Sequence, residues 1–300
     1  MLLLRKTLKK IFATTLTMLI ILTVYTLPTT SNDVLRTNLE IKENSNYIDN
    51  IYLLDNNLLV KVNTYIEGKN IQEKIEKIIT YLTIDNNKIP IGLNGYIPKN
   101  TKILDINIED KILNINFSKE LLETDIEQEK IITGITYSLL ELDEIEKIKI
   151  TVENNKIKNY ENILDKKIGI NNKYLFNTRN NINKVVIYYI DKIDNNMYYV
   201  PITKYLNDNR EKIEIIIDEL KKEFIENNLI CLIDTKLKLL DYKEESNVLF
   251  LNFNNYLIDN DDNITEKNID IISNSVFDNY DVNMVMFEVN NKKIKQVKRQ

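Results

Sequence analysis

Carboxylates are the side chains of this sequence that could support enzyme chemistry. The chain has 45 Asp and Glu residues, one cysteine and no histidine, which excludes histidine triads, histidine-ligated metals and cysteine-based zinc sites. A glycoside hydrolase needs only two positioned acids, and Glu73 with Glu76 or Asp105 with Glu109 are close in sequence. Acids this numerous are mostly solvated, so we prefer a protein without enzymatic activity and keep a wall hydrolase as the weaker alternative.

Two polar loops resemble ligand sites. Residues 259–263 read Asp-Asn-Asp-Asp-Asn, like the start of a calcium loop, but Ile264 stands where glycine is needed and Asp270 where glutamate is needed. We interpret them as a polar turn before a helix that begins near Thr265. Residues 92–95, Gly-Leu-Asn-Gly, could contact a ligand, although a flexible turn before the next strand is the simpler interpretation.

Phosphate-binding glycine loops are absent from the sequence. Its five glycines fit neither the dinucleotide fingerprint nor the P-loop. Cys231 lies in the apolar stretch 229–233 and is expected to be a small buried side chain rather than a reactive thiol. Many of the 17 tyrosines lie in strand patterns, which favours packing over glycan stacking. We therefore predict no catalytic, cofactor-binding or metal-ligating residues and no cofactor.

The N-terminus predicts a membrane anchor. A basic segment, residues 1–10, precedes the largely apolar residues 11–27, and a polar spacer follows at residues 28–47. Charge before an apolar run is the order of a secretory signal or a signal anchor. No cleavage site is obvious, so we prefer an uncleaved single-pass anchor with the remainder outside the cell membrane. A cleaved and secreted protein is the alternative.

Net charge argues against nucleic acid as a partner. The whole chain carries −5, and residues 1–27 carry four positive charges and no negative ones, which leaves −9 on the predicted exported part. Nucleic acid requires a basic footprint.

The predicted elements form two copies of one pattern. In residues 48–158 we expect strands at 51–54 and 58–66, a helix at 71–82 and a strand pair at 97–118 with Leu104, Ile106 and Ile108 on one face. Thr124 to Glu127 has the form of a capping box before a second helix, and a strand closes the copy at 146–152. Residues 184–296 repeat this order at an offset of about 136, with a weaker copy of the strand pair at 236–254.

This order predicts an α+β fold. Each copy reads strand, strand, helix, strand, strand, helix, strand, and we expect one mixed or antiparallel sheet per copy with two helices on one face. Residues 159–183 join the copies and carry apolar side chains, including Leu164, Ile168 and Ile170. A free linker would be more polar, so we expect this segment to pack against both copies.

With these elements in place, the chain resembles the GerMN domain family, as a tandem pair. The first copy carries the resemblance: residues 97–104, Ile-Pro-Lys-Asn-Thr-Lys-Ile-Leu, look like the family's start of the strand pair, and residues 111–120 look like its end. Residues 134–140 and 145–152 are similar to its second helix and closing strand. The resemblance spans roughly residues 48–295. The second copy lacks the Pro and Thr of the motif, and the lipid-bearing cysteine of many relatives is missing.

The resemblance implies an extracytoplasmic, membrane-tethered assembly protein of sporulation. Its partners would be other envelope or sporulation membrane proteins, with self-association plausible by analogy of fold. The alternative is a general envelope module that binds peptidoglycan or another ligand outside sporulation. We expect the first copy, with the better preserved motif, to retain a contact surface if either copy does.

Overall fold

The computed structural model describes residues 49–174, 182–222, 229–230, 233–258 and 265–299. The predicted anchor at 11–27, the spacer at 28–47, Cys231 and most of the calcium-like loop lie outside these residues. Within the described ranges, no helix combines the length and apolar character that a membrane span requires.

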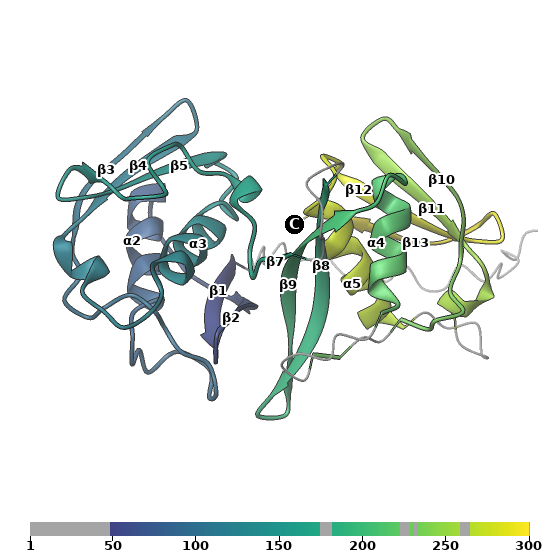
Figure 1. Cartoon of the computed structure of the whole chain (residues 1–300), viewed down its shortest axis with the longest axis horizontal. Coiled ribbons are helices and arrows are strands. Elements are labelled where there is room, and N and C mark those ends of the chain that lie inside the picture. The colour runs from purple at the N-terminus through teal and green to yellow at the C-terminus, as the bar shows by residue number, and fades with distance from the viewer. Residues whose placement is uncertain (1–48, 175–181, 223–228, 231–232, 259–264, 300) are drawn as a thin grey trace, which may run out of the picture. The chain divides into compact units, whose positions relative to one another are not determined.

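The predicted order of elements is present in both copies (Figure 1). We call residues 49–158 the first repeat and residues 182–299 the second repeat. The first repeat contains β1 (Asp49–Asp55), β2 (Leu58–Thr64), α2 (Ile71–Tyr81), β3 (Ile103–Glu109), β4 (Ile112–Phe117), α3 (Gln128–Leu139), β5 (Lys147–Val152) and β6 (Asn155–Lys156).

The second repeat has the same elements. They are β8 (Ile182–Ile193), β9 (Asn196–Asn207), α4 (Lys212–Leu220), β10 (Leu239–Glu245), β11 (Val248–Phe253), α5 (Glu266–Phe277), β12 (Met284–Val289) and β13 (Lys292–Lys298). Strands β6 and β13 extend the predicted pattern by one strand per copy. The short strand β7 (Lys173–Tyr174) belongs to the segment between the repeats.

The expectation of a single sheet per repeat is wrong. Strands β3-β4-β5-β6 form one mixed sheet and β10-β11-β12-β13 another, each with a central parallel pair. The first hairpin of each repeat lies apart from that sheet, and both hairpins enter a five-stranded sheet ordered β1-β2-β9-β7, with β8 paired to β9. In each repeat the two helices lie between the four-stranded sheet and the hairpin (Figure 1), so they bury apolar side chains on two sides.

The prediction that Leu104 shares a face with Ile106 and Ile108 is wrong, because β3 contains a β-bulge. The pairing with β4 shifts between Ile103 and Asp105, so Ile103, Ile106 and Ile108 pack on the core. Leu104 is displaced outward and is 47% exposed. The extra residue of a bulge reverses the alternation of side chains, which a period of two cannot reveal. The same shift leaves Leu240 of β10 51% exposed.

The predicted capping box before α3 does not form. The helix begins at Gln128 after an N-cap at Glu127 that makes no side-chain cap bond. The Thr124 hydroxyl instead accepts a hydrogen bond from the amide of Ile126 at 3.3 Å. Thr and Ser side chains form such local turns in competition with caps. The apolar stripe of the helix is as predicted, because Ile131, Ile135 and Leu139 are buried.

Asparagine and aspartate have a conformational role in the hairpin turns. Pairs of adjacent residues adopt positive φ at Asp110–Lys111, Glu153–Asn154, Asp194–Asn195, Ser246–Asn247 and Asn290–Asn291. Two-residue hairpin turns with positive φ at both positions favour Asn and Asp. Asn and Asp at these positions therefore favour the tight turns between strands.

Candidate functional site

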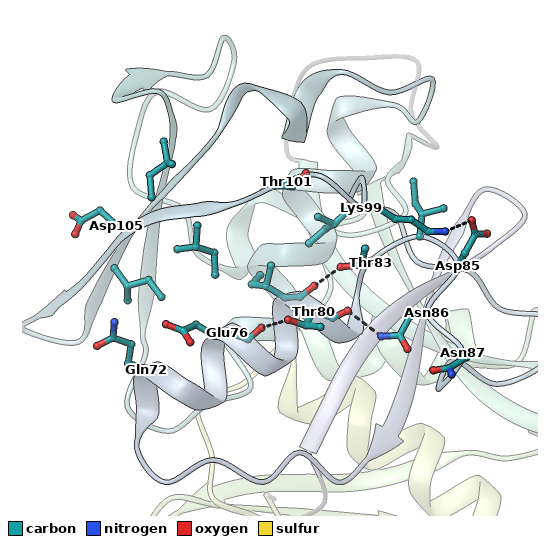
Figure 2. Close-up of a pocket in the computed structure, with 16 residues that line it drawn as sticks. Gln72, Glu76, Thr80, Thr83, Asp85, Asn86, Asn87, Lys99, Thr101 and Asp105 are labelled. Atoms are coloured by element: carbon teal, nitrogen blue, oxygen red, sulfur yellow. Dashed lines mark hydrogen bonds and ion pairs between the residues drawn. The ribbon is translucent and has the colours of Figure 1, made fainter.

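A groove of about 780 Å³ opens on the first repeat between α2 and strand β3 (Figure 2). Helix α2 contributes Gln72, Glu76 and Thr80 to one wall. The opposite wall is the motif that carried the family resemblance, from Ile97 through Thr101 into the first half of β3.

Close backbone contacts place this wall. The Ile97 amide donates to the Leu82 carbonyl at 3.1 Å, and the Ile84 amide donates to the Ile97 carbonyl at 2.9 Å, so the chain returns to the end of α2 before it enters β3. Gly95 permits the return, because a Cβ there would lie 2.3 Å from the Thr83 carbonyl oxygen. These hydrogen bonds hold the two ends of the loop 84–96 together.

Paired and unpaired polar groups line the groove. Lys99 and Asp85 form an ion pair at 3.0 Å at one end. Among the residues that the structure describes, the side chains of Glu76 and Asp105 make no ion pair. The Thr101 hydroxyl is buried without a hydrogen-bond partner there, which is costly for a polar atom.

The second repeat carries a different side chain at the corresponding position of its strand. Tyr242 of β10 pairs with Leu251 at the register position where Ile106 of β3 pairs with Ile115. Desolvation and the carboxylates of Glu211 and Glu214 raise the pKa of Tyr242, so its phenol lies near the start of α4. The second repeat thus has a larger side chain, Tyr242, at the strand position of Ile106.

A second polar cluster joins the two repeats. The Lys166 ammonium, from the segment between them, lies 2.7 Å from Oε1 of Glu141 and 3.0 Å from Oδ1 of Asp278. Lys61 adds a second cation 3.7 Å from Glu141. The side chains of Glu141 and Asp278 are 11% and 8% exposed, so each buried carboxylate has a cation beside it.

A tyrosine in each repeat makes equivalent hydrogen bonds to a serine and to the carboxylate that pairs with Lys166. The amide of Tyr52 donates to the Ser138 hydroxyl at 2.9 Å, and the amide of Tyr188 donates to the Ser275 hydroxyl at 3.0 Å. The phenol of Tyr52 donates to Glu141 at 3.4 Å, and that of Tyr188 donates to Asp278 at 2.6 Å. We call Tyr52, Glu141, Lys166, Tyr188 and Asp278 the joint cluster.

Electrostatics hold Glu141 of the joint cluster ionised. Burial would raise the pKa of Glu141, but attraction to Lys166 and Lys61, with hydrogen bonds from Lys166 and Asn50, lowers that pKa to about 2. Burial would lower the pKa of Lys166, yet Asp278 and Glu141 raise it well above its usual value. Burial raises the pKa of Tyr52 and of Tyr188, which keeps both phenols protonated as donors.

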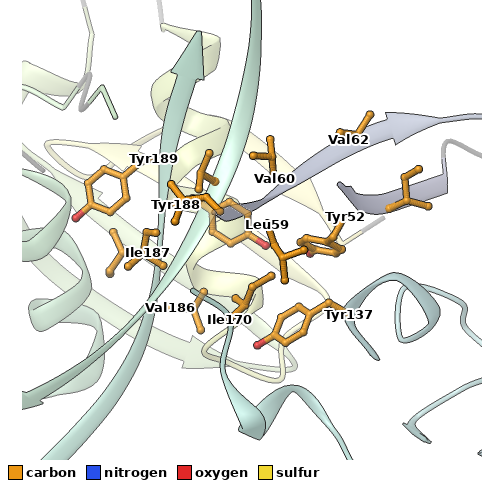
Figure 3. Packing of buried hydrophobic residues seen from close by; sticks show 14 of the residues in the cluster. Tyr52, Leu59, Val60, Val62, Tyr137, Ile170, Val186, Ile187, Tyr188 and Tyr189 are labelled. Carbon is orange, nitrogen blue, oxygen red and sulfur yellow. The ribbon is translucent and has the colours of Figure 1, made fainter. Parts of the chain in front are cut away.

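Buried apolar side chains pack around Tyr52 and Tyr188 of the joint cluster (Figure 3). Tyr52 meets Tyr137 edge to face at a ring distance of 5.5 Å, and Ile170 is fully buried. The Asn171 side chain donates to the carbonyls of Leu59 and Pro201, each at 2.8 Å, and so bonds β2 and β9 together. Residues of the segment 159–174 thus take part in the core.

The residues considered for chemistry from the sequence lie elsewhere. Glu73 pairs with Lys77 at 2.8 Å and accepts from the Lys69 amide, as part of the start of α2. Gly92, at φ 89°, lies against Ile193, since a Cβ there would be 2.4 Å from the Ile193 side chain. The described residues contain no group of three or more potential metal-ligating acids or cysteines.

Sequence reasoning overlooked the joint cluster and Thr101. Glu141 and Asp278 each follow the second helix of their repeat at nearly the same offset as the strand pairs, and this repetition was the available signal. Lys166 has no counterpart in that comparison, because it belongs to the intervening segment.

Comparison with known proteins shows which protein family the fold and the motifs resemble. Residues 50–158 match the family model described as "Germane: Sporulation and spore germination". The solved tandem GerMN domains of the sporulation protein GerM from Bacillus subtilis superpose with a TM-score of 0.76 at 22% identity, over 84% of this chain and 98% of that one. The two repeats thus share the fold of tandem GerMN domains, and the predicted resemblance to that family is confirmed.

A protein of similar sequence is the spore germination protein GerM of Bacillus subtilis strain 168. It is 27% identical over 187 residues, which cover 57% of this chain and 50% of the relative. The match therefore spans about half the length of that protein.

Proposed function

We propose that this GerM-like chain is a non-enzymatic assembly protein of the sporulating cell envelope. Residues 11–27 tether it to the membrane, and the two repeats contact other envelope proteins on the extracytoplasmic side. The joint cluster carries this proposal, because its buried charges and the shared five-stranded sheet hold both repeats in one compact body, residues 48–300. Such a body suits a scaffold that presents fixed surfaces.

The pairing of charged groups also supports a non-enzymatic role. The buried pair Lys204–Glu219, at 2.8 Å, and the joint cluster are saturated by internal hydrogen bonds. A catalytic acid needs access to substrate and a pKa near the working pH. Glu141 lines the polar cavity described below, but its pKa is about 2, far below the working pH, and its carboxylate is already paired with Lys166.

Imaging and co-purification test the proposal. A fluorescent fusion of the full chain should concentrate at the sporulation septum, and the chain should co-purify with membrane proteins. A uniformly cytoplasmic, monomeric protein would refute it. Zymography on peptidoglycan should stay blank, whereas a cleared band would support the wall-hydrolase alternative.

A polar cavity favours the second candidate function, a peptidoglycan or ligand-binding module outside sporulation. This cavity of about 930 Å³ is lined by Asn50, Lys61, Asn274 and Tyr199 beside the joint cluster, and these groups suit the hydroxyl and amide groups of a sugar. Retention of the full chain by isolated peptidoglycan, and its loss in Asn274→Leu, would favour this candidate over the scaffold.

A further inference from the structure

Strand β3 is an open edge beside a groove. It ends the sheet order β3-β4-β5-β6, so along its outer side no strand of the described chain pairs with it. The unpaired amides and carbonyls of an edge strand can pair with another extended chain, which would lie about 4.8 Å away. Here that position coincides with the groove against α2, which provides a second wall.

The side chains of β3 specify what an added strand should carry. Asp105, Asn107 and Glu109 are exposed on the outer face, whereas Ile106 and Ile108 turn toward the core and are half-buried. Cross-strand neighbours in a sheet share a face, so an added strand would place one set of side chains beside the acids and the other beside the isoleucines. Charge complementarity calls for basic residues in the first set and apolar residues in the second.

The groove holds an orphan donor in addition. The Thr101 hydroxyl, just before β3, is buried without a hydrogen-bond partner in the described part of the chain. Such a group is usually satisfied by a ligand or water. In the second repeat Tyr242 stands at the register position of Ile106, so the two edges differ in their side chains.

We propose that the groove between α2 and β3 binds an extended segment of a partner protein, in which basic and apolar residues alternate, as an added strand on β3. This inference rests on the proposed scaffold function and names the contact surface for it. A second copy of the chain is the competing occupant, because its own edge strand β13 carries Lys292, Lys293 and Lys298.

A peptide titration tests the proposal. The probe is a fluorescent synthetic peptide in which lysine alternates with valine, added to the full chain and followed by anisotropy. We expect saturable binding, and hydrogen exchange should show protection of β3 amides but not of β10 amides. A peptide with glutamate in place of lysine should not bind. A lysine peptide N-methylated at alternate residues should lose binding, because its charge is unchanged but its strand hydrogen bonds are blocked.

Variants locate the site. Asp105→Lys should weaken peptide binding about five- to tenfold at low salt. Asp241→Lys, at the equivalent register position of β10, is the matched control and should leave affinity unchanged. Thr101→Val removes the orphan hydroxyl with little change of shape, so it should leave the free protein at least as stable while it weakens binding.

Several results would overturn the proposal. They are equal affinity for the N-methylated peptide, sensitivity to Asp241→Lys instead of Asp105→Lys, or failure of every lysine–valine peptide to bind. Concentration-dependent dimers of the full chain that Asp105→Lys abolishes would assign the edge to a second copy instead. If the peptide fails while the chain still co-purifies with membrane proteins, the scaffold function stands and only this surface is wrong.

Discussion

Replacement of Lys166 by methionine tests whether the joint cluster holds the repeats together. Methionine keeps the apolar stem but removes the cation that lies within 3.0 Å of both Glu141 and Asp278. Breaking a fully buried pair costs about 3–5 kcal/mol because an uncompensated charge remains. The Lys166 side chain is 34% exposed, so water can replace part of the interaction, and we expect a loss of about 2–3 kcal/mol in the free energy of unfolding at neutral pH.

The loss should depend on pH with a defined sign. In the native protein the pKa of Glu141 is lowered to about 2, so its stabilisation is fully present above the ordinary pKa of about 4.3 and disappears as pH falls toward 2. In Lys166→Met, burial should instead raise that pKa, so the variant recovers stability as the carboxyl takes up a proton. The difference between the two proteins should be largest near neutrality and shrink toward acid.

Urea unfolding of the two proteins across this pH range is the assay. Lys167→Met is the matched control, because that side chain is 92% exposed and lies 3.8 Å from Asp165. It should change stability by less than about 0.5 kcal/mol. A Lys166→Met loss no larger than that of the control, or a loss that does not vary with pH, would refute the role assigned to the joint cluster.

Further substitutions probe other parts of the fold, each by urea or thermal unfolding. Gly134→Ala should destabilise by about 2 kcal/mol, because its Cβ would lie 2.4 Å from the ring of Tyr96, and unchanged stability would contradict the packing. Ser138→Ala and Ser275→Ala each strand a buried tyrosine amide and should cost similar amounts of about 1–2 kcal/mol, whereas unequal costs would argue against their equivalence. Burial and a neighbouring carboxyl raise the pKa of Asp191 from its ordinary value of 3.8 to about 6, so the native state loses stability as pH rises from about 4 to about 6; its Asn variant should be more stable by about 1 kcal/mol at pH 8 and not at about pH 3.5.

The repeat and its helices could be predicted because they depend on local patterns. Apolar spacing predicted the helix at 71–82, and the structure confirms it as α2, with Ile75, Ile78 and Ile79 buried. Alternation likewise predicted both strand pairs. It failed at Leu104, since a bulge is set by how two strands register against each other rather than by the residues of one strand.

The sequence revealed one wall of the groove but not the groove itself. The residues from Ile97 to Thr101 were recognised as a motif, but the motif was interpreted as sheet scaffold. Its position opposite Glu76 depends on the return of the chain to the end of α2, which requires the close approach at Gly95. Hydrogen bonds between distant segments leave no periodic trace along the chain.

The sequence by itself determined the order of elements, the duplication and the absence of histidine chemistry, because each follows from residue type and spacing. The tertiary structure decided how the repeats combine. It placed the two hairpins in a shared sheet, brought Glu141 and Asp278 to either side of Lys166, and left β3 as an open edge among the strands that the structure describes. These features depend on contacts between residues more than 20 positions apart, where buried charges must find partners and strand edges must be paired or exposed.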